Sequence, residues 1–312
     1  MLRTGVARHR HRRPRPVFGA ALWLVVAGLL AVPMSGCTDD DDQSASQPDE
    51  PLAAGTLAPD PGPVHVHGLG VNPKDDALLI ASHTGLYRAQ GTRKPRRVGN
   101  YQDTMAFEVV GPDRFLGSGH PDVRADLPAY LGLIESRDGG RTWRPRSLQG
   151  KVDFHLLEAD GQRVYGYGSD FETRAQRLLA SADGGRTWTA RRVPEPLVSL
   201  ALDPADSRHL VASGQEALHV SRDGGKSWRT LAGGPGLLAW SAPGRLFSVD
   251  EKGVVAVSAM GGRTWQATGT VSGAPAAFDG GPGGRLLVAL HDGTIKQSAN
   301  GGVTWRVRSR PG

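Results

Sequence analysis

Ser136-Arg-Asp-Gly-Gly-Arg-Thr-Trp143 is the stretch that decides the fold of this 312-residue chain, because its pattern recurs four more times. The other copies are Ser181-Ala-Asp-Gly-Gly-Arg-Thr-Trp188, Ser221-Arg-Asp-Gly-Gly-Lys-Ser-Trp228, Ser258-Ala-Met-Gly-Gly-Arg-Thr-Trp265 and Ser298-Ala-Asn-Gly-Gly-Val-Thr-Trp305. Successive tryptophans lie 45, 40, 37 and 40 residues apart. A period of about 40 residues, with short strands and turn signals between the copies, is typical of the blades of a β-propeller.

The repeated motif has the composition of a tight turn between two strands. Its aspartate accepts hydrogen bonds from backbone N–H groups, and its paired glycines supply positive φ without steric cost. Its tryptophan opens the returning strand and packs against the neighbouring sheet. Met260 and Asn300 replace the aspartate in the last two copies, so we expect weaker turns there and a structural aspartate rather than a catalytic one. The expected structural residues are Asp138, Asp183, Asp223, Trp143, Trp188, Trp228, Trp265 and Trp305.

These segments resemble Asp-boxes, also called BNR repeats, which occur in sialidases, sortilin-like receptors and many bacterial surface lipoproteins. The five copies cover residues 136–305. The resemblance implies a propeller of the sialidase superfamily, a family often labelled glycosyl hydrolase. It implies the fold more firmly than the activity, because unrelated functions share such folds.

The chain divides into six similar units over residues 64–309, of which the first has no recognisable box. We therefore predict an all-β, six-bladed propeller of four-stranded antiparallel blades, since a seventh blade needs residues that the count does not supply. The 43 glycines and 22 prolines also argue against a helical bundle. The predicted second strands of the blades are 77–82, 114–118, 163–167, 209–213, 245–249 and 285–290.

The net charge of +6 comes from the first 36 residues, which hold six arginines and no acidic residue. The rest of the chain has 31 basic and 31 acidic residues, so no affinity for nucleic acid is expected. Cys37, the single cysteine, rules out a disulfide framework and a cysteine-rich zinc site.

The N-terminal segment has the pattern of a secretory leader. An apolar run of 16 residues (17–32) follows the arginines, and Met34-Ser35-Gly36-Cys37 resembles the lipobox of bacterial lipoproteins. We predict a signal peptide over 1–36, lipidation of Cys37, a disordered acidic tether over 37–62 and the propeller over 63–312. Lipid on Cys37 would hold the protein on the extracytoplasmic face of the cell membrane; the alternative is an ordinary signal peptide that happens to precede a cysteine.

Propeller topology predicts where the polar residues meet. In each blade, the start of the innermost strand and the end of the second strand lie at the same mouth of the central channel, and the boxes lie at the other end. Five of the eight histidines after residue 36 fall at this mouth, all in the first three blades. The predicted ligand-binding residues are His65, His67, His83, Asp103, His120, Asp122, Asp153 and His155.

A His-x-His pair joined by further imidazoles and carboxylates suits a divalent metal such as Zn²⁺ or Cu²⁺. The predicted metal ligands are His65, His67, His120 and His155. The alternative is that these side chains cap strands and bind water. His291, near the end of the second strand of blade six, is a weaker candidate.

Two other functions remain open from the sequence. The first is glycoside hydrolysis, by a carboxylate pair such as Asp103 and Asp153 or by Tyr165 or Tyr167 with Asp170, although the Arg-Ile-Pro signature of sialidases has no counterpart here. The second is a scaffold that captures a protein partner on one face. A small ligand or a glycan is also compatible with the mouth, and the pattern does not choose among these partners.

Overall fold

The computed structural model describes residues 60–91, 93–281 and 284–311. The predicted leader, Cys37 and the tether up to residue 59 lie outside these ranges. Within the described residues, no helix has both the length and the apolar character needed to span a bilayer.

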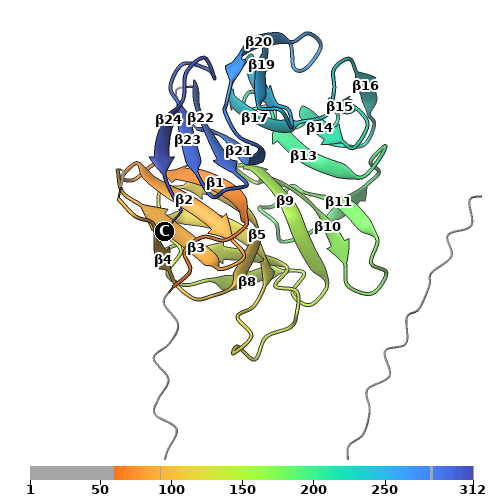
Figure 1. Cartoon of the computed structure of the whole chain (residues 1–312). Helices are drawn as coiled ribbons and strands as arrows, with labels where there is room; N and C mark the ends of the chain where they lie inside the picture. Colours follow the sequence, from red (N-terminus) through yellow and green to blue (C-terminus); the bar gives the residue numbers. More distant parts are fainter. Residues whose placement is uncertain (1–59, 92, 282–283, 312) are drawn as a thin grey trace, which may run out of the picture. The chain divides into compact units, whose positions relative to one another are not determined.

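Six antiparallel sheets, each of four consecutive strands, form a ring (Figure 1). Blades one to three are β1 (Val66–Asn72), β2 (Ala77–Ser82), β3 (Gly85–Ala89) and β4 (Arg96–Val98); β5 (Asp103–Gly111), β6 (Arg114–His120), β7 (Leu133–Ser136) and β8 (Arg144–Ser147); β9 (Val152–Asp160), β10 (Arg163–Asp170), β11 (Gln176–Ser181) and β12 (Thr189–Arg191). Blades four to six are β13 (Leu197–Leu202), β14 (Leu210–Gly214), β15 (Leu218–Ser221) and β16 (Arg229–Leu231); β17 (Leu237–Ala242), β18 (Arg245–Val249), β19 (Val254–Ser258) and β20 (Gln266–Thr270); β21 (Pro275–Gly281), β22 (Arg285–Leu290), β23 (Ile295–Ser298) and β24 (Arg306–Ser309). The prediction of a six-bladed β-propeller is confirmed.

The predicted second strands agree with β2, β18 and β22 at both ends and differ elsewhere by a few residues. Two strands continue further toward the channel mouth than predicted, so that His120 ends β6 and Asp170 ends β10. His209 was predicted to begin a strand, but its backbone N–H donates to Asp206 O (2.8 Å) in the preceding turn, and β14 begins at Leu210.

The core lies between blades, because each sheet is covered on both faces by its neighbours. All six residues of β2 are buried, and residues 77–81 form a continuous apolar run rather than an alternating pattern. Blade one packs on blade six through Val66, Leu69, Leu287 and Ile295, which closes the ring by side-chain packing. Buried Arg308 reinforces this closure by donating to the backbone oxygens of Gly91 and Asp76, both at 3.0 Å.

The box turns have the hydrogen bonds that the sequence predicts. In the second box, Asp183 Oδ1 accepts from the backbone N–H of Thr187 (2.9 Å), and Oδ2 accepts from the Thr187 hydroxyl (2.7 Å). The Ser181 hydroxyl accepts from the Gly185 N–H at 2.8 Å. Gly185 has φ +82°, and a Cβ at this position would lie 2.2 Å from Leu133 Cδ2. This glycine therefore serves both the turn and the close approach of blade two.

Each box tryptophan joins an apolar cluster that also includes the preceding blade. The Trp188 ring lies 5.2 Å from the Phe154 ring, and its indole N–H donates to the Ser147 hydroxyl of blade two at 2.9 Å. The same hydroxyl donates to Gly185 O at 2.6 Å. The box thus ties its own hairpin to the neighbouring blade.

The two variant boxes keep only part of this network. In the fourth, the Ser258 hydroxyl still accepts from Gly262 N–H (2.8 Å), but the Met260 side chain offers no oxygen to the following backbone. In the fifth, Asn300 Oδ1 accepts from Thr304 N–H at 3.0 Å, as an aspartate would. The fourth turn therefore lacks an acceptor that the other four turns have.

We expect Met260→Asp to raise the free energy of unfolding by about 1 kcal/mol, because it supplies a hydrogen-bond acceptor to a turn that lacks one. Met260→Asn should give a smaller gain, and Asp183→Ala a loss of similar size. Urea-induced unfolding measures all three. A Met260→Asp protein no more stable than the wild type would contradict the structural role assigned to the aspartate.

Candidate functional site

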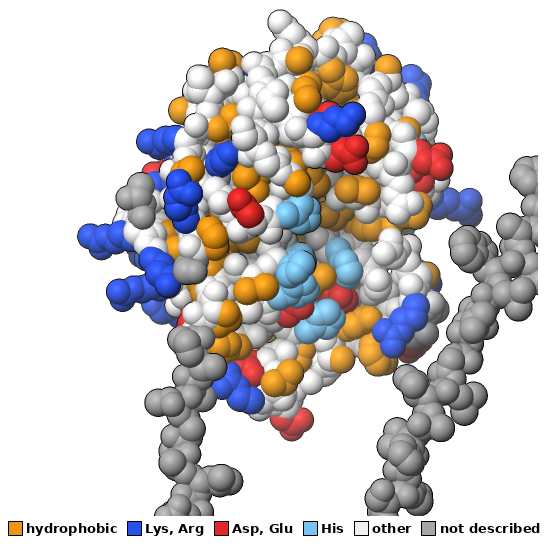
Figure 2. Space-filling model, in the orientation of Figure 1, with side chains coloured by type: hydrophobic (Ala, Val, Ile, Leu, Met, Phe, Trp, Pro, Cys, Tyr) orange, Lys and Arg blue, Asp and Glu red, His pale blue; other side chains and the backbone are white. Residues whose placement is uncertain are grey.

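The histidine-rich strand ends meet at one mouth of the channel, as the topology predicts. Figure 2 shows pale-blue histidines and red carboxylates gathered around a hollow near the centre of this face. The contributing elements are the segment before β1, the starts of β1, β5 and β9, and the ends of β2 and β6. The box turns lie at the other end of each blade.

His83, just after β2, is the centre of the first part of the cluster. Its ring lies 5.2 Å from the ring of His65 and 4.4 Å from that of His67, centroid to centroid. His65 has φ +50° and precedes β1, and the register shifts between Val66 and Gly68. This irregular backbone, rather than simple strand alternation, brings both rings against His83.

The second part of the cluster alternates carboxylates with imidazoles. Asp103 Oδ2 lies 2.9 Å from His83 Nδ1 and 3.3 Å from His120 Nδ1. The other ring nitrogen of His120 lies 3.4 Å from Asp153 Oδ2, which is also 2.9 Å from His155 Nε2. A continuous polar chain therefore crosses the mouth from blade one to blade three.

Burial and charge hold two neighbouring groups in opposite ionisation states. Desolvation, with repulsion from His83, lowers the pKa of His67 to about 4, so its imidazole is neutral at pH 7. Burial alone would raise the pKa of Asp103, but hydrogen bonds with His120 and His83 outweigh it, and the carboxyl pKa lies below its ordinary value. The bond to Asp103 in turn raises the pKa of His120.

Three atoms of the cluster are buried without a hydrogen-bond partner among the described residues: His67 Nε2, Asp103 Oδ1 and Asp153 Oδ1. Unpaired buried polar atoms are uncommon, and a bound ion is one explanation for them. His67, His83 and Asp103 each offer one ligand atom, and these three atoms lie within 4.8 Å of one another. A neutral imidazole and an ionised carboxylate in this group suit a divalent cation.

The close group therefore contains a different set of residues from the predicted metal ligands. Of the predicted metal set, His67 belongs to the close group, and His83 and Asp103 join it. His120 and His155 contact the carboxylates, and His65 contacts the His83 ring.

Other predicted site residues lie apart from this cluster. Asp122 forms a bidentate pair with Arg124, and Asp170 Oδ1 accepts two hydrogen bonds from Thr173. The Tyr165 and Tyr167 rings are buried in an apolar cluster, and their hydroxyls donate to Ser207 O (2.8 Å) and Gln176 Oε1 (2.6 Å). The tyrosines are thus positioned as core residues. His291 lies exposed after β22.

Sequence reasoning missed three acidic residues inside the channel. Glu108, Glu158 and Asp279 line a cavity of about 130 Å³ together with His67 and His155. Each follows a Phe or Leu in the middle of an innermost strand, in Ala-Phe-Glu, Leu-Leu-Glu and Ala-Phe-Asp. An acidic residue repeated at this inward position in three blades is the signal that could have found them.

These carboxylates sit in an environment that disfavours their charge. Burial raises the pKa of Glu108 and of Glu158 well above the ordinary value, and repulsion from the neighbouring acids raises both further. Burial also raises the pKa of Asp279 to about 6. A Leu202 N–H donates to Glu158 Oε2 at 3.2 Å and only partly offsets this effect. Burial and mutual repulsion therefore favour the protonated forms of these carboxyl groups in the channel below the mouth.

Comparison with known proteins supports the fold alone. No protein-family model matches the chain, and no curated protein matches it. Among solved structures, it is similar to a GH74 xyloglucanase from Xanthomonas campestris (17% identity, TM-score 0.51, covering 79% of this chain and 45% of that one). It is also similar to an ancestral GH74 enzyme, with 14% identity and a TM-score of 0.53 over 80% of this chain and 39% of that one. A third similar structure is YCF48 bound to D1 peptide, with 19% identity and a TM-score of 0.45 over 70% of each chain. The chain spans less than half the length of the two GH74 chains.

The channel carboxylates predict a pH dependence of stability. The pKa of Asp279 is higher in the folded state than in the unfolded chain. The contribution of this residue to the free energy of unfolding therefore falls as pH rises from about 4 to about 6. We expect Asp279→Asn to be more stable than the wild type above pH 6, with the difference vanishing below pH 4. Thermal unfolding across this range measures it, with the exposed Glu172→Gln as control. A stability difference that does not change with pH would contradict the assignment.

Proposed function

We propose that this protein is a binding propeller that holds a divalent transition-metal ion, Zn²⁺ or Cu²⁺, at the mouth of its channel. The observation that carries the proposal is the group formed by His67, His83 and Asp103, whose ligand atoms lie within 4.8 Å of one another. The orphaned Nε2 of His67 supports it, because a metal ion would give this atom a partner.

The donor set suits these ions chemically. Two imidazole nitrogens and one carboxylate oxygen are ordinary ligands of Zn²⁺ and Cu²⁺. His67 does not need to lose a proton at neutral pH, because its pKa is about 4. Three protein ligands leave at least one coordination position for water or for an exogenous ligand.

The surrounding residues support the three ligands. His120 contacts Asp103 Oδ2 on one side and Asp153 Oδ2 on the other, so it orients the ligating carboxylate. Such outer contacts typically change metal affinity 10- to 100-fold. Since His120 engages both carboxylates that the sequence suggested for glycoside hydrolysis, the geometry favours binding over that reaction.

The location proposed for the protein is the extracytoplasmic face of the cell membrane, through lipid on Cys37. Asp60 accepts a hydrogen bond from the Tyr87 hydroxyl (2.7 Å) and pairs with Arg97, which fixes the start of the propeller on blade one. Residues 60–64 then lead to His65. The predicted tether would therefore join the propeller at the outer strands of blade one, five residues before His65. Mass spectrometry of Cys37 in protein from membranes tests the lipidation: an unmodified cysteine overturns it.

Metal binding is tested by titrating Zn²⁺ or Cu²⁺ into full-length protein that carries no histidine tag. We expect one ion per chain, and at least about tenfold weaker binding in His67→Ala and in His83→Ala, because each removes a ligand. His291→Ala, which removes an exposed histidine that does not belong to the group of His67, His83 and Asp103, should bind as the wild type does.

Binding that is equally strong in the His67, His83 and His291 variants would place the metal elsewhere on the protein. No binding of either ion by the wild type would overturn the proposal. Circular dichroism of each variant separates a lost ligand from a lost fold.

A further inference from the structure

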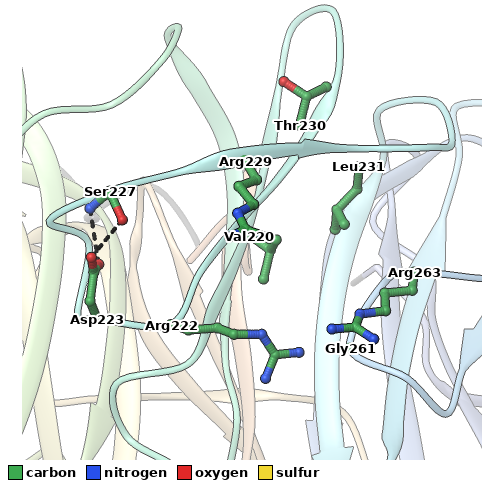
Figure 3. Close-up of a pocket in the computed structure, with 9 residues that line it drawn as sticks. All are labelled: Val220, Arg222, Asp223, Ser227, Arg229, Thr230, Leu231, Gly261 and Arg263. Carbon is green, nitrogen blue, oxygen red and sulfur yellow. Dashed lines mark hydrogen bonds between the residues drawn. The ribbon is translucent and has the colours of Figure 1, made fainter.

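Three arginines surround a second pocket, on the box end of the propeller and away from the channel mouth. Its volume is about 320 Å³, and it lies between blade four and the box turn of blade five. Arg222 comes from the box of blade four, Arg229 from the start of β16, and Arg263 from the box of blade five. Figure 3 shows Arg222 and Arg263 extending toward one another across the pocket.

The guanidinium groups of these three arginines have no ion pair or hydrogen bond to any residue in the described part of the chain. Other box arginines are engaged: Arg186 donates to Asp183 O at 2.9 Å, and Arg141 to Asp138 O at 2.6 Å. Arg263 occupies the same box position, but its side chain lines the pocket instead. The irregular box thus contributes one of the three charges.

Blade two shows what partner such arginines take. Glu135 stands directly before its box and pairs across the sheet with Arg144, and Val220 stands directly before the box of blade four and pairs in the same way with Arg229. The Glu135 carboxylate binds Arg137 at 3.1 Å, Arg146 at 2.8 Å and Arg114 at 3.5 Å.

Arg137 and Arg222 occupy the same position of their boxes. In blade four, however, the residue at the position of Glu135 is Val220, which offers Arg222 no charge. The pocket is therefore a place where the chain repeats the arginine of blade two without the carboxylate that neutralises it.

The remaining charge at this pocket does not neutralise it. Asp223 is its single acidic lining residue, and the Ser227 hydroxyl and N–H bind that carboxylate (Figure 3). The bond from Ser227 is the main reason that the pKa of Asp223 is lowered to about 2, so the group stays ionised. Three guanidinium groups against one carboxylate leave a net charge of +2. Val220 and Leu231 add an apolar wall.

We propose that this pocket binds the carboxylate of an exogenous ligand, which takes the place that Glu135 fills in blade two. The guanidinium groups of Arg222 and Arg263 contact the carboxylate, Arg229 adds to the positive field, and Val220 and Leu231 contact the apolar part of the ligand. Arginine suits this role because its planar fork binds a carboxylate with two parallel hydrogen bonds. The proposal is independent of metal binding at the mouth.

The sharpest test is Val220→Glu, which builds the missing carboxylate into the chain. Full-length protein is titrated with N-acetylglutamate amide, whose side chain copies Glu135, with glucuronate as a sugar acid, and with N-acetylglutamine amide as the neutral counterpart. We expect at least one acid to bind the wild type in the millimolar range, with the neutral probe at least about tenfold weaker. The tighter acid identifies the ligand as peptide-like or sugar-like.

Val220→Glu should abolish binding, and the double variant Arg222→Gln with Arg263→Gln should weaken it at least about tenfold. These arginines are exposed, so the double variant keeps the test valid if Val220→Glu does not fold. Arg306→Gln removes one exposed positive charge from blade six and should leave binding unchanged. The proposal is overturned if neither acid binds below about 10 mM, if the neutral probe binds as well, or if the double variant binds as the wild type does.

Discussion

The structure depends on apolar contact between neighbouring blades. A blade such as the first, whose second strand is buried along its whole length, has two apolar faces and cannot cover both by itself. Each sheet consists of four consecutive strands, so the ring closes without exchange of a strand between its ends. Closure rests on side-chain packing between blades one and six and on Arg308, whose guanidinium binds backbone oxygens of blade one.

The box turns make this packing specific. Their aspartate and serine satisfy the backbone of the turn, their glycines allow blade two to approach Gly185, and their tryptophans bury apolar area against the preceding blade. The same hairpins carry arginines on their outer surface. In blade two the Glu135 carboxylate binds the box arginine Arg137, whereas in blade four Val220 stands at the corresponding position and Arg222 lines a pocket. A structural repeat thus becomes a candidate binding surface where its arginines lack a carboxylate at the position of Glu135.

The channel has different chemistry along its length. The mouth carries an alternating chain of imidazoles and carboxylates, in which hydrogen bonds keep Asp103 ionised while burial keeps His67 neutral. Deeper inside, Glu108, Glu158 and Asp279 share one cavity, and burial raises their pKa values. The innermost strands bring the channel carboxylates together where solvent is scarce, whereas the mouth also receives imidazoles from the ends of second strands.

The sequence by itself determined the fold and the face of the site. The repeat of Ser, Asp, Gly-Gly and Trp acts through contacts within a hairpin and with the adjacent blade, so its five copies predicted five blades. The similar strand pattern of residues 64–100 predicted the sixth. It also placed His67, Asp103 and Asp153 at one mouth, because strand direction follows from blade topology. Only the tertiary structure decided which of these side chains meet. The positive φ of His65 and the bulge after it bring the rings of His65 and His67 against His83. The inward positions of Glu108, Glu158 and Asp279 meet only when the ring closes. Contacts between blades depend on side-chain packing across residues far apart in the chain, and a pattern read along one strand does not contain them.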